Sequence, residues 1–369
     1  MKRRSLISRV VFGGISCIAL FFLLLNSAPA KNSSKKDKPA GDSNSVPSAK
    51  AEPVPKTMKA IIVHQYGGPE VLKLEEVPVP QPKDTEVLIR VIASGVNPAD
   101  PLIVSGKYAD KFGTHLPLTP GYDVAGIIVK AGKEVKMLKV GEAVYGYILF
   151  GGGWAEYCTA NQFEVTPKPK SLTFTDAASV PLAGLTAFQA LAGYGNLVEG
   201  RSALIHGGSG GVGSFAIQLA KARGAKVIAT ASTANQDLLK QLGADVAVDY
   251  TKQKFEDVAH DVNVVLDTVG GDTLTRSYPV VKKDGTLVTI VGRCDDTQAR
   301  KHGIVCKSLW SHPDPGQLKA LTILIDDGKI KPVVSQVLPL TDAAKAMTQA
   351  ETHHTRGKMV LKIADEPKS

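Results

Sequence analysis

Residues 202–213 read SALIHGGSGGVG. The apolar run 202–206 predicts a short buried strand, and regularly spaced apolar residues predict an amphipathic helix over 212–223. Gly224 would end that helix, and a second apolar run, 226–231, predicts the next strand. The three segments form a βαβ unit whose first turn is made of glycines.

The glycines of this turn, Gly208, Gly210 and Gly213, are spaced as G-x-G-x-x-G. Glycine at these places allows a tight turn, lets the backbone approach a pyrophosphate, and lets the helix pack closely on the strand. The helix N-terminus offers free N–H groups and the positive end of its dipole to phosphates. We therefore predict a dinucleotide site rather than a plain glycine-rich turn. Its residues are Gly208, Ser209, Gly210, Gly211, Val212 and Gly213.

The end of the second strand indicates which dinucleotide binds. An NAD site usually has Asp or Glu about 20 residues after the glycines, where the carboxylate bonds the ribose 2′-hydroxyl. Here that place reads Thr230-Ala231-Ser232-Thr233, and the nearest acid, Asp237, falls in the next expected helix. Small hydroxyls such as that of Ser232 accept a 2′-phosphate, so NADPH is favoured over NADH, although the loop has no Arg or Lys.

The first 30 residues have the features of a targeting segment. Lys2-Arg3-Arg4 precedes a strongly apolar stretch over residues 10–25, and Ala28-Pro29-Ala30 is a small-x-small cleavage site. The stretch is short for a membrane-spanning helix, which needs about 20 residues. We expect residues 1–30 to be an export signal, with a membrane anchor as the alternative. Residues 31–56, rich in Lys, Ser and Pro, are expected to form a disordered linker.

The charge and the cysteines limit the possible functions. Ten basic and three acidic residues in 1–56 supply +7 of the net charge of +9, which leaves +2 for the rest of the chain. A nearly neutral body does not indicate a nucleic-acid binder. After residue 56 the chain has Cys158, Cys294 and Cys306. Because their number is odd and their spacing is neither paired nor metal-like, we expect no disulfide framework.

Changes in hydrophobic period divide the rest of the chain. Short strands between Gly and Pro turns predict a β-rich module over 57–180. Strands and helices then alternate, which predicts a doubly wound parallel-sheet domain over 181–312. Residues 313–366 contain two further helices and a strand that we expect to return to the first module. The expected fold class is α/β.

Several motifs in order along residues 58–364 make the chain resemble the medium-chain dehydrogenase/reductase superfamily, in its zinc-independent quinone oxidoreductase (zeta-crystallin-like) branch. Beside the glycine run, the motifs are Gly95-Val-Asn-Pro-Ala-Asp100, Pro120-Gly-Tyr-Asp-Val-Ala-Gly126, Gly153-Trp-Ala-Glu-Tyr157, Leu182-Ala-Gly-Leu-Thr-Ala187, Val264-Val-Leu-Asp-Thr-Val-Gly-Gly271 and Arg356-Gly-Lys358. The resemblance implies a GroES-like catalytic domain with an inserted Rossmann domain and an active cleft between them.

The resemblance also bears on zinc. Zinc alcohol dehydrogenases of this superfamily place a Cys in the first catalytic loop and a His-Glu pair after a glycine, where this chain has Asn97 and Tyr122-Asp123. Zinc prefers thiolate and imidazole ligands in a tetrahedral set, and this chain does not supply one. We therefore expect no metal site. A substrate reduced without zinc must delocalise the added charge itself, as quinones and α,β-unsaturated carbonyls do.

By resemblance, Asn97 lies beside the nicotinamide and the substrate, and Tyr108 is the candidate phenol donor. Relatives often carry a second Tyr where this chain has Leu102, which implies a more apolar pocket. The residues implied on the cofactor side are Thr186, Tyr250, Val291, Gly292 and Lys358. Five of these residues also have an ordinary structural interpretation. Asn97 would be a turn residue, Tyr108, Tyr250 and Thr186 would be packing residues, and Lys358 would be a solvated surface lysine.

The expected function is zinc-free reduction of a quinone or an enone by NADPH, exported or membrane-tethered through residues 10–25. Two alternatives stay open: an enoyl-thioester or alkenal reductase on the same scaffold, and a redox-silent NADPH-binding protein. The family also implies a homodimer. No nucleic-acid partner is expected.

Overall fold

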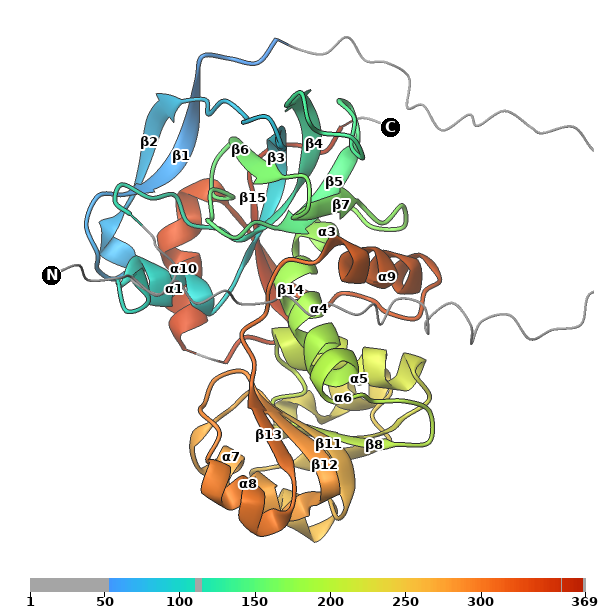
Figure 1. Ribbon diagram of the computed structural model, residues 1–369. Helices are drawn as coiled ribbons and strands as arrows, with labels where there is room; N and C mark the ends of the chain where they lie inside the picture. Colours follow the sequence, from blue (N-terminus) through green and yellow to red (C-terminus); the bar gives the residue numbers. More distant parts are fainter. Residues whose placement is uncertain (1–52, 110–114, 353, 368–369) are drawn as a thin grey trace, which may run out of the picture. The chain divides into compact units, whose positions relative to one another are not determined.

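The computed structural model describes residues 53–109, 115–352 and 354–367 (Figure 1). The predicted targeting segment, 1–30, lies outside the described residues, as does all of the predicted linker except residues 53–56. Within the described part of the chain, no helix is long and apolar enough to cross a membrane.

The β-rich module contains a seven-stranded sheet in the order β14-β15-β3-β4-β5-β7, with β6 also paired to β3, and a separate antiparallel pair, β1–β2. Its strands are β1 (Thr57–Val63), β2 (Leu72–Pro78), β3 (Glu86–Val96), β4 (Asp123–Ala131), β5 (Ala143–Tyr147), β6 (Tyr157–Asn161), β7 (Val165–Pro167), β14 (Val334–Pro339) and β15 (Lys358–Lys362). Strand β3 is central, since it pairs with β4, β6 and β15. Nine of its eleven residues are buried, which suits a strand covered on both faces.

The second sheet is fully parallel, in the order β10-β9-β8-β11-β12-β13. Its strands are β8 (Ser202–Ile205), β9 (Lys226–Ala231), β10 (Val246–Asp249), β11 (Val262–Asp267), β12 (Val281–Thr289) and β13 (Val305–Ser308). The helices of this part are α4 (Pro181–Phe188), α5 (Gly211–Ala222), α6 (Gln236–Gln241), α7 (Gly271–Ser277) and α8 (Asp296–His302). This order of strands is that of a Rossmann domain. The predicted α/β fold with a doubly wound parallel sheet is confirmed.

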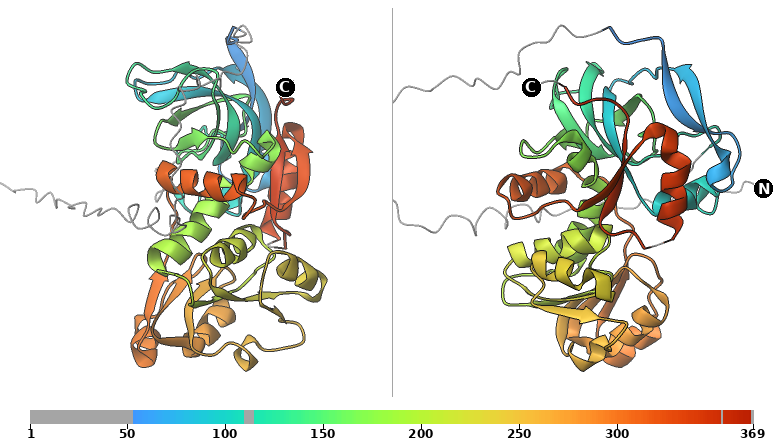
Figure 2. Two further views of the ribbon diagram at one scale, coloured as in Figure 1. Left: turned by 90° about the vertical axis from the view of Figure 1, so that its right-hand side faces the viewer. Right: turned by 180° about the vertical axis from the view of Figure 1, so that it is seen from behind.

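The C-terminal segment connects the two sheets. After β13 it forms α9 (Pro315–Asp326), β14, α10 (Ala343–Glu351) and β15. Helix α10 packs beside β1 and α1 (Ala99–Val104), in a cluster that joins Ile61 and Val104 to Ala346 and Met347. Figure 2 shows this red helix next to the blue strands from behind as well. Strand β15 pairs antiparallel with β3, so the last strand does return to the first module.

Two details differ from the sequence-based expectations. The helix expected over 183–193 is α4 followed by a separate π-helical segment, Gln189–Tyr194. The expectation of no disulfide is wrong, because Cys294 and Cys306 form one, with sulfurs 2.03 Å apart. Strand β13 was not recognised in the sequence, and its pairing with β12 brings Cys306 back beside the loop that holds Cys294. The unpaired third cysteine, Cys158, is buried in the other module.

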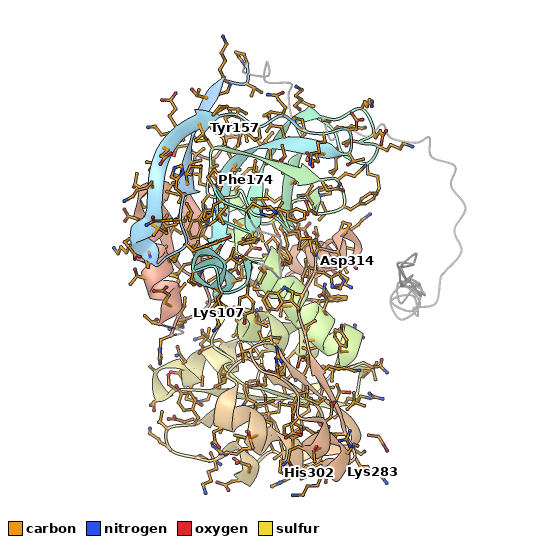
Figure 3. All side chains as sticks on the ribbon, turned by 60° about the vertical axis from the view of Figure 1, so that its left-hand side comes forward. Lys107, Tyr157, Phe174, Lys283, His302 and Asp314 are labelled. Carbon is orange, nitrogen blue, oxygen red and sulfur yellow. A yellow bond between two sulfur atoms is a disulfide. The ribbon has the colours of Figure 1, made fainter. Side chains whose placement is uncertain are left out.

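At the amino end of β12, Asp284 N donates to Gly303 O, just after the C-terminus of α8, at 2.8 Å. Figure 3 shows Lys283 and His302 at this end of the Rossmann sheet, away from the edge that carries the glycine turn. These two side chains therefore take no part in the site described next.

Candidate active site

The glycine turn joins β8 to α5 at the carboxyl edge of the parallel sheet, where the strand order changes direction between β8 and β11. Gly207 has a φ of +63°, and a Cβ on Gly213 would lie 2.2 Å from the Gly207 carbonyl oxygen. A Cβ on Gly208 would lie 2.8 Å from Leu239 Cδ2 of α6. Backbone conformation and close packing therefore require glycine here.

Helix α5 begins without a side-chain cap. Its N-cap is Gly210, and the first hydrogen bond within the helix runs from Ser214 N to Gly210 O at 3.0 Å. The N–H groups of the three residues before Ser214 therefore have no acceptor inside α5. Together with the positive end of the helix dipole, they suit a phosphate group. The turn fits the pyrophosphate of a dinucleotide.

A segment of the β-rich module lies against this turn. Gly357 N donates to Ser209 O at 2.8 Å, and Gly357 and Gly210 form an isolated parallel bridge. Gly357 has a φ of +60°, and a Cβ there would lie 2.1 Å from Val333 O. Arg356, directly before it, is exposed. The contact of Gly357 with Ser209 thus places the exposed Arg356 next to a residue of the phosphate-binding turn.

The ribose side of the site is formed where β9 and β10 end together. Ser232 Oγ accepts from Asn235 Nδ2 at 3.2 Å, and the Tyr250 side chain is 57% exposed. Thr233 Oγ1 donates to Asp249 Oδ2 at 2.6 Å. Hydrogen bonds from Thr233 and Thr251 lower the pKa of Asp249 to about 2. The sequence reading missed this carboxylate, because Asp249 reaches Thr233 only through the pairing of β10 with β9.

The opposite side of the site is organised by a buried carboxylate at the end of β11. Asp267 Oδ1 accepts from Gly270 N at 2.9 Å, and Oδ2 accepts from Thr289 Oγ1 at 2.7 Å. Thr289 Oγ1 in turn accepts from Gly292 N at 3.0 Å. Asp267 thus holds both loops that follow β11 and β12, including the exposed Val291. Asp267 lies in the family motif of residues 264–271, but the sequence did not indicate that it holds these two loops.

Thr186 lies on α4, buried. Its hydroxyl donates to Leu182 O at 2.7 Å, and the Ser311 hydroxyl lies within hydrogen-bond distance of it at 2.9 Å. The first contact lies within α4, and the second connects α4 to the segment after β13. The structure therefore gives Thr186 protein partners, while its predicted role beside the nicotinamide stays a prediction.

In the β-rich module, Asn97 is the centre of a buried cluster. Its Nδ2 donates to Asp123 Oδ2 at 2.9 Å, and its Oδ1 accepts from Lys358 Nζ. Lys358 Nζ also donates to Val96 O at 2.9 Å and lies 3.2 Å from Asp123 Oδ2. Lys358 is 4% exposed. Its ammonium group is thus held beside Asn97 inside the module, whereas its predicted phosphate contact would place that group at the glycine turn.

Asp100 completes the cluster. Its Oδ2 accepts from Asn97 N at 2.6 Å and its Oδ1 from Gly121 N at 3.3 Å. Burial raises the pKa of Asp100 to about 7, against the lowering effect of these hydrogen bonds and of Lys358. Around Asn97 the cluster thus contains two carboxyl groups, those of Asp100 and Asp123, and one lysine, Lys358.

The second predicted catalytic residue, Tyr108, follows α1. Its ring packs on Trp310 with centroids 5.5 Å apart and planes tilted by 56°. Trp310 belongs to the segment that leaves β13. Tyr108 thus links the β-rich module to the Rossmann part, a position compatible with both the phenol-donor and the packing interpretation.

A pocket of about 250 Å³ opens in the β-rich module at Tyr122. It is lined by His115, Pro117, Leu118, Thr119, Tyr122, Phe150, Gly151 and Gly152. Tyr122 lies directly between Gly121, which bonds Asp100, and Asp123. Burial and the neighbouring Asp100 raise the pKa of Tyr122, which therefore stays a protonated donor. In the sequence, Tyr122 lies within the motif of residues 120–126, where related zinc enzymes have a His, but it was not predicted to be a site residue.

Comparisons with known proteins agree with this geometry. Residues 83–171 match the alcohol dehydrogenase GroES-like domain, and residues 242–361 match the zinc-binding dehydrogenase family. The chain is 41% identical over 321 residues to the 2-methylene-furan-3-one reductase of Solanum lycopersicum, covering 84% of this chain and 80% of that protein. It is 40% identical to the chloroplastic NADPH-dependent alkenal/one oxidoreductase of Arabidopsis thaliana, with the same coverage. The GroES-like part of the fold prediction is confirmed.

Among solved structures, the quinone oxidoreductase of Coxiella burnetii is similar, with a TM-score of 0.78 and 35% identity. The match covers 84% of this chain and all of that one. The similarity therefore extends over most of this chain and is not confined to one of its two sheets.

The name of one matching family raises the question of zinc. In the described ranges, no group of three His, Cys, Asp or Glu residues is arranged to hold a metal ion. The amide oxygen of Asn97 is bonded to the Lys358 ammonium, and a bound metal would have to displace that cation. Burial raises the pKa of the Cys158 thiol to about 12, and the other two described cysteines form a disulfide. The donor set of this site does not fit zinc.

Proposed function

Because the chain belongs to the quinone oxidoreductase branch of the medium-chain dehydrogenase/reductase superfamily, we propose that it uses NADPH to reduce a quinone or the double bond of an α,β-unsaturated carbonyl compound. One observation carries the proposal: residues 356–358 join the phosphate-binding turn to the buried Asn97 cluster. The proposed cofactor-binding turn and the proposed catalytic residue Asn97 are thus connected by one short segment of the chain.

Different residues are proposed to bind the cofactor and the substrate. The glycine turn and α5 bind the pyrophosphate, and Arg356 supplies a positive charge beside it. When bound, the reduced nicotinamide supplies a hydride. Tyr122 and the Asn97 amide offer hydrogen bonds to the substrate oxygen, on which negative charge builds as the double bond or quinone is reduced.

The reaction is proposed to proceed without zinc. The support is the donor set: Asn97 and Tyr122 stand where related zinc enzymes have a Cys and a His, and Asn97 is engaged by a lysine. Inductively coupled plasma analysis of the active protein tests this. Activity that survives dialysis against a chelator, with less than one zinc per ten chains, is expected, whereas stoichiometric zinc in the active form would contradict the proposal.

NADPH is the proposed cofactor, supported by the similarity to the NADPH-dependent oxidoreductase of Arabidopsis thaliana and by the hydroxyl-lined ribose side at Ser232. Asp249 lies near this side, but its carboxylate already accepts hydrogen bonds from Thr233 and Thr251. Initial rates with NADPH and NADH decide the matter, and we expect a higher kcat/KM with NADPH. The Asp249→Asn variant should increase that preference, because it removes a negative charge near the 2′-phosphate.

The decisive experiment follows NADPH oxidation by the purified full chain with one ortho-quinone, one para-quinone, one enone and one enoyl thioester. Rapid loss of NADPH with a quinone or the enone is expected. Turnover of the thioester alone would favour the enoyl-thioester alternative. Tight NADPH binding without turnover of any acceptor would favour a redox-silent binding protein.

The quaternary state is proposed to be a homodimer through the Rossmann part. Strand β13 pairs on one side only, with β12, and Val305 on it is 46% exposed. An unpaired parallel edge of this kind is a place for a second copy to add its own strand. Light scattering behind size exclusion measures the mass. A monomer at micromolar concentration would contradict this part of the proposal.

The location is proposed to be outside the cytoplasm, either free or attached through residues 10–25. The support within the described residues is the Cys294–Cys306 disulfide, because such bonds persist in oxidising compartments. Fractionation of cells that express the full chain, with mass analysis of its N-terminus, separates the cleaved, anchored and cytoplasmic forms. A full-length cytoplasmic chain with both thiols free would contradict export.

A further inference from the structure

Lys358 follows an unusual path between the two functional parts of the site. Its stem passes the first residue of α5, since a Cβ on Gly211 would lie 3.0 Å from Lys358 Cδ. Its ammonium group donates to Val96 O and Asn97 Oδ1 and lies 3.2 Å from Asp123 Oδ2. The preceding residue, Gly357, is bonded to the glycine turn. One short segment thus contacts both the phosphate-binding turn and the buried polar cluster.

These contacts determine how the Asn97 amide is oriented. An ammonium group can only donate, so the end of the amide that faces Lys358 is its oxygen. A carboxylate accepts, so the end that faces Asp123 is the NH₂ group, at 2.9 Å. Asp123 is itself oriented by Leu182 N, which donates to its other oxygen at 2.7 Å. The amide nitrogen has two hydrogens, and one of them is left for a ligand.

We propose that Lys358 is a positioning residue, which locks Asn97 as a hydrogen-bond donor and ties its position to the glycine turn. This inference rests on the proposed function, in which the substrate oxygen gains negative charge and needs a donor. Without the ammonium, only Asp123 still holds the NH₂ end of the amide. When Asp123 also loses its charge, the amide is free to rotate by half a turn and present its oxygen, which repels the negative charge on the substrate. The arrangement selects acceptors whose oxygen becomes an anion, the enone and quinone class.

A purely structural role for Lys358 is the competing explanation, because removing it leaves Asp123 buried without its cation. The test therefore uses Lys358→Met together with the double variant Lys358→Met/Asp123→Asn, in which position 123 no longer carries a charge that needs the lysine. Lys362→Met is the matched control, since Lys362 lies on the same strand, points to solvent and pairs with the exposed Asp365. Thermal unfolding is measured for all variants.

At saturating NADPH, both Lys358 variants are expected to lose on the order of 100-fold in kcat, the size of a misplaced catalytic group. The double variant is expected to unfold closer to the wild-type temperature than the single one does. Lys362→Met should keep both kcat and unfolding temperature. A double variant with wild-type kcat would overturn the proposal, because charge balance alone would then explain Lys358.

A second readout needs no turnover. The fragment 2′-phospho-ADP-ribose occupies the glycine turn but lacks the nicotinamide, so any effect at Asn97 must pass through the protein. In the wild type we expect it to slow amide hydrogen exchange at residues 95–100 as well as at 207–213. In the double variant only the 207–213 effect should remain. Equal slowing at 95–100 in both proteins would overturn the inference, whereas inactive wild type with this coupling intact would count only against the proposed function.

Discussion

Asn97, Asp100, Asp123 and Lys358 are all buried and hydrogen-bonded to one another or to the backbone. Burying charges costs free energy unless they are paired, so such a cluster persists only when its partners are placed accurately. Asn97 and the residues around it could be selected from the sequence through their motif. The pairing with Lys358 could not, because 261 residues separate the two and an isolated lysine usually faces solvent.

Tyr122 is the phenol that we expect to contact the substrate, because it lines the pocket and directly precedes Asp123, which bonds Asn97. In Tyr122→Phe one hydrogen bond to a developing negative charge is lost, which is worth about 1.5–3 kcal/mol. We expect kcat/KM for the carbonyl substrate to fall at least tenfold, with the KM for NADPH unchanged. Steady-state kinetics with both substrates varied gives the two constants.

The control for this substitution is Tyr194→Phe, since Tyr194 is 47% exposed, ends the π-helical segment and does not line the pocket. It should retain wild-type kinetics. If Tyr122→Phe does so too, the hydroxyl of Tyr122 has no contact with the reacting group.

Asp100 predicts a pH dependence of stability. Its folded-state pKa of about 7 lies above the usual value for Asp, so between these values the folded protein holds a proton that the unfolded chain has released. The free energy of unfolding should therefore fall as the pH rises from about 4 to 7 and change little above 7. The contribution of this group has an upper limit of about 4 kcal/mol. Urea unfolding at several pH values measures it.

The variant Asp100→Asn tests that assignment. It should remove this fall in stability between pH 4 and 7, because the side chain no longer titrates. Asp237→Asn is the comparison, since Asp237 is 91% exposed and makes only a long contact with Lys240. An unchanged pH profile in Asp100→Asn would show that another group is responsible.

Among the elements, the βαβ unit at the glycine turn was the easiest to recognise. Both its strands and its helix are within one or two residues of the expected bounds, because local hydrophobic period and glycine spacing specify them. Short elements were harder. Helices α1, α3 (Phe174–Ala178), α7 and α8 have seven residues or fewer, too few to establish a period, and they were not recognised.

Two substitutions in the glycine turn are expected to affect NADPH binding and folding stability differently. A Cβ on Gly210 meets only the Gly207 carbonyl, at 3.3 Å, and Gly210 has a negative φ. Gly210→Ala should therefore fold normally but weaken NADPH binding at least tenfold, because the methyl group occupies the approach of the pyrophosphate. Gly213→Ala should also lower the unfolding temperature, since its Cβ would lie 2.2 Å from a backbone oxygen. Fluorescence titration and thermal unfolding measure the two effects.

Gly193→Ala provides the reference for these variants, because a Cβ at Gly193 meets no atom within 4 Å. It should bind NADPH as the wild type does. If Gly210→Ala binds NADPH as tightly as the wild type, the prediction that the pyrophosphate binds at this turn is wrong.

At the scale of the whole molecule, the disulfide between Cys294 and Cys306 closes a loop around α8 at the edge of the Rossmann sheet. Cross-linking residues 12 apart restricts the unfolded chain, with a stabilisation of about 3 kcal/mol. The variant Cys294→Ser/Cys306→Ser should lose about that free energy of unfolding. It should show no further loss when a reductant is added.

Thiol counting on the denatured full chain checks the bond itself. Two more thiols are expected after reduction than before. Equal counts would mean that the cysteines are not bonded in the purified protein, and the disulfide would then no longer support export.

The sequence by itself determined the parallel Rossmann sheet, the glycine turn and the family motifs, because strand and helix periods and glycine spacing act over a few neighbouring residues. The tertiary structure decided which distant side chains meet. Pairing of β15 with β3 buries Lys358 beside Asn97, pairing of β10 with β9 brings Asp249 to Thr233, and pairing of β13 with β12 joins two cysteines. These contacts depend on strand order and register across the sheets, which no local pattern in the chain encodes.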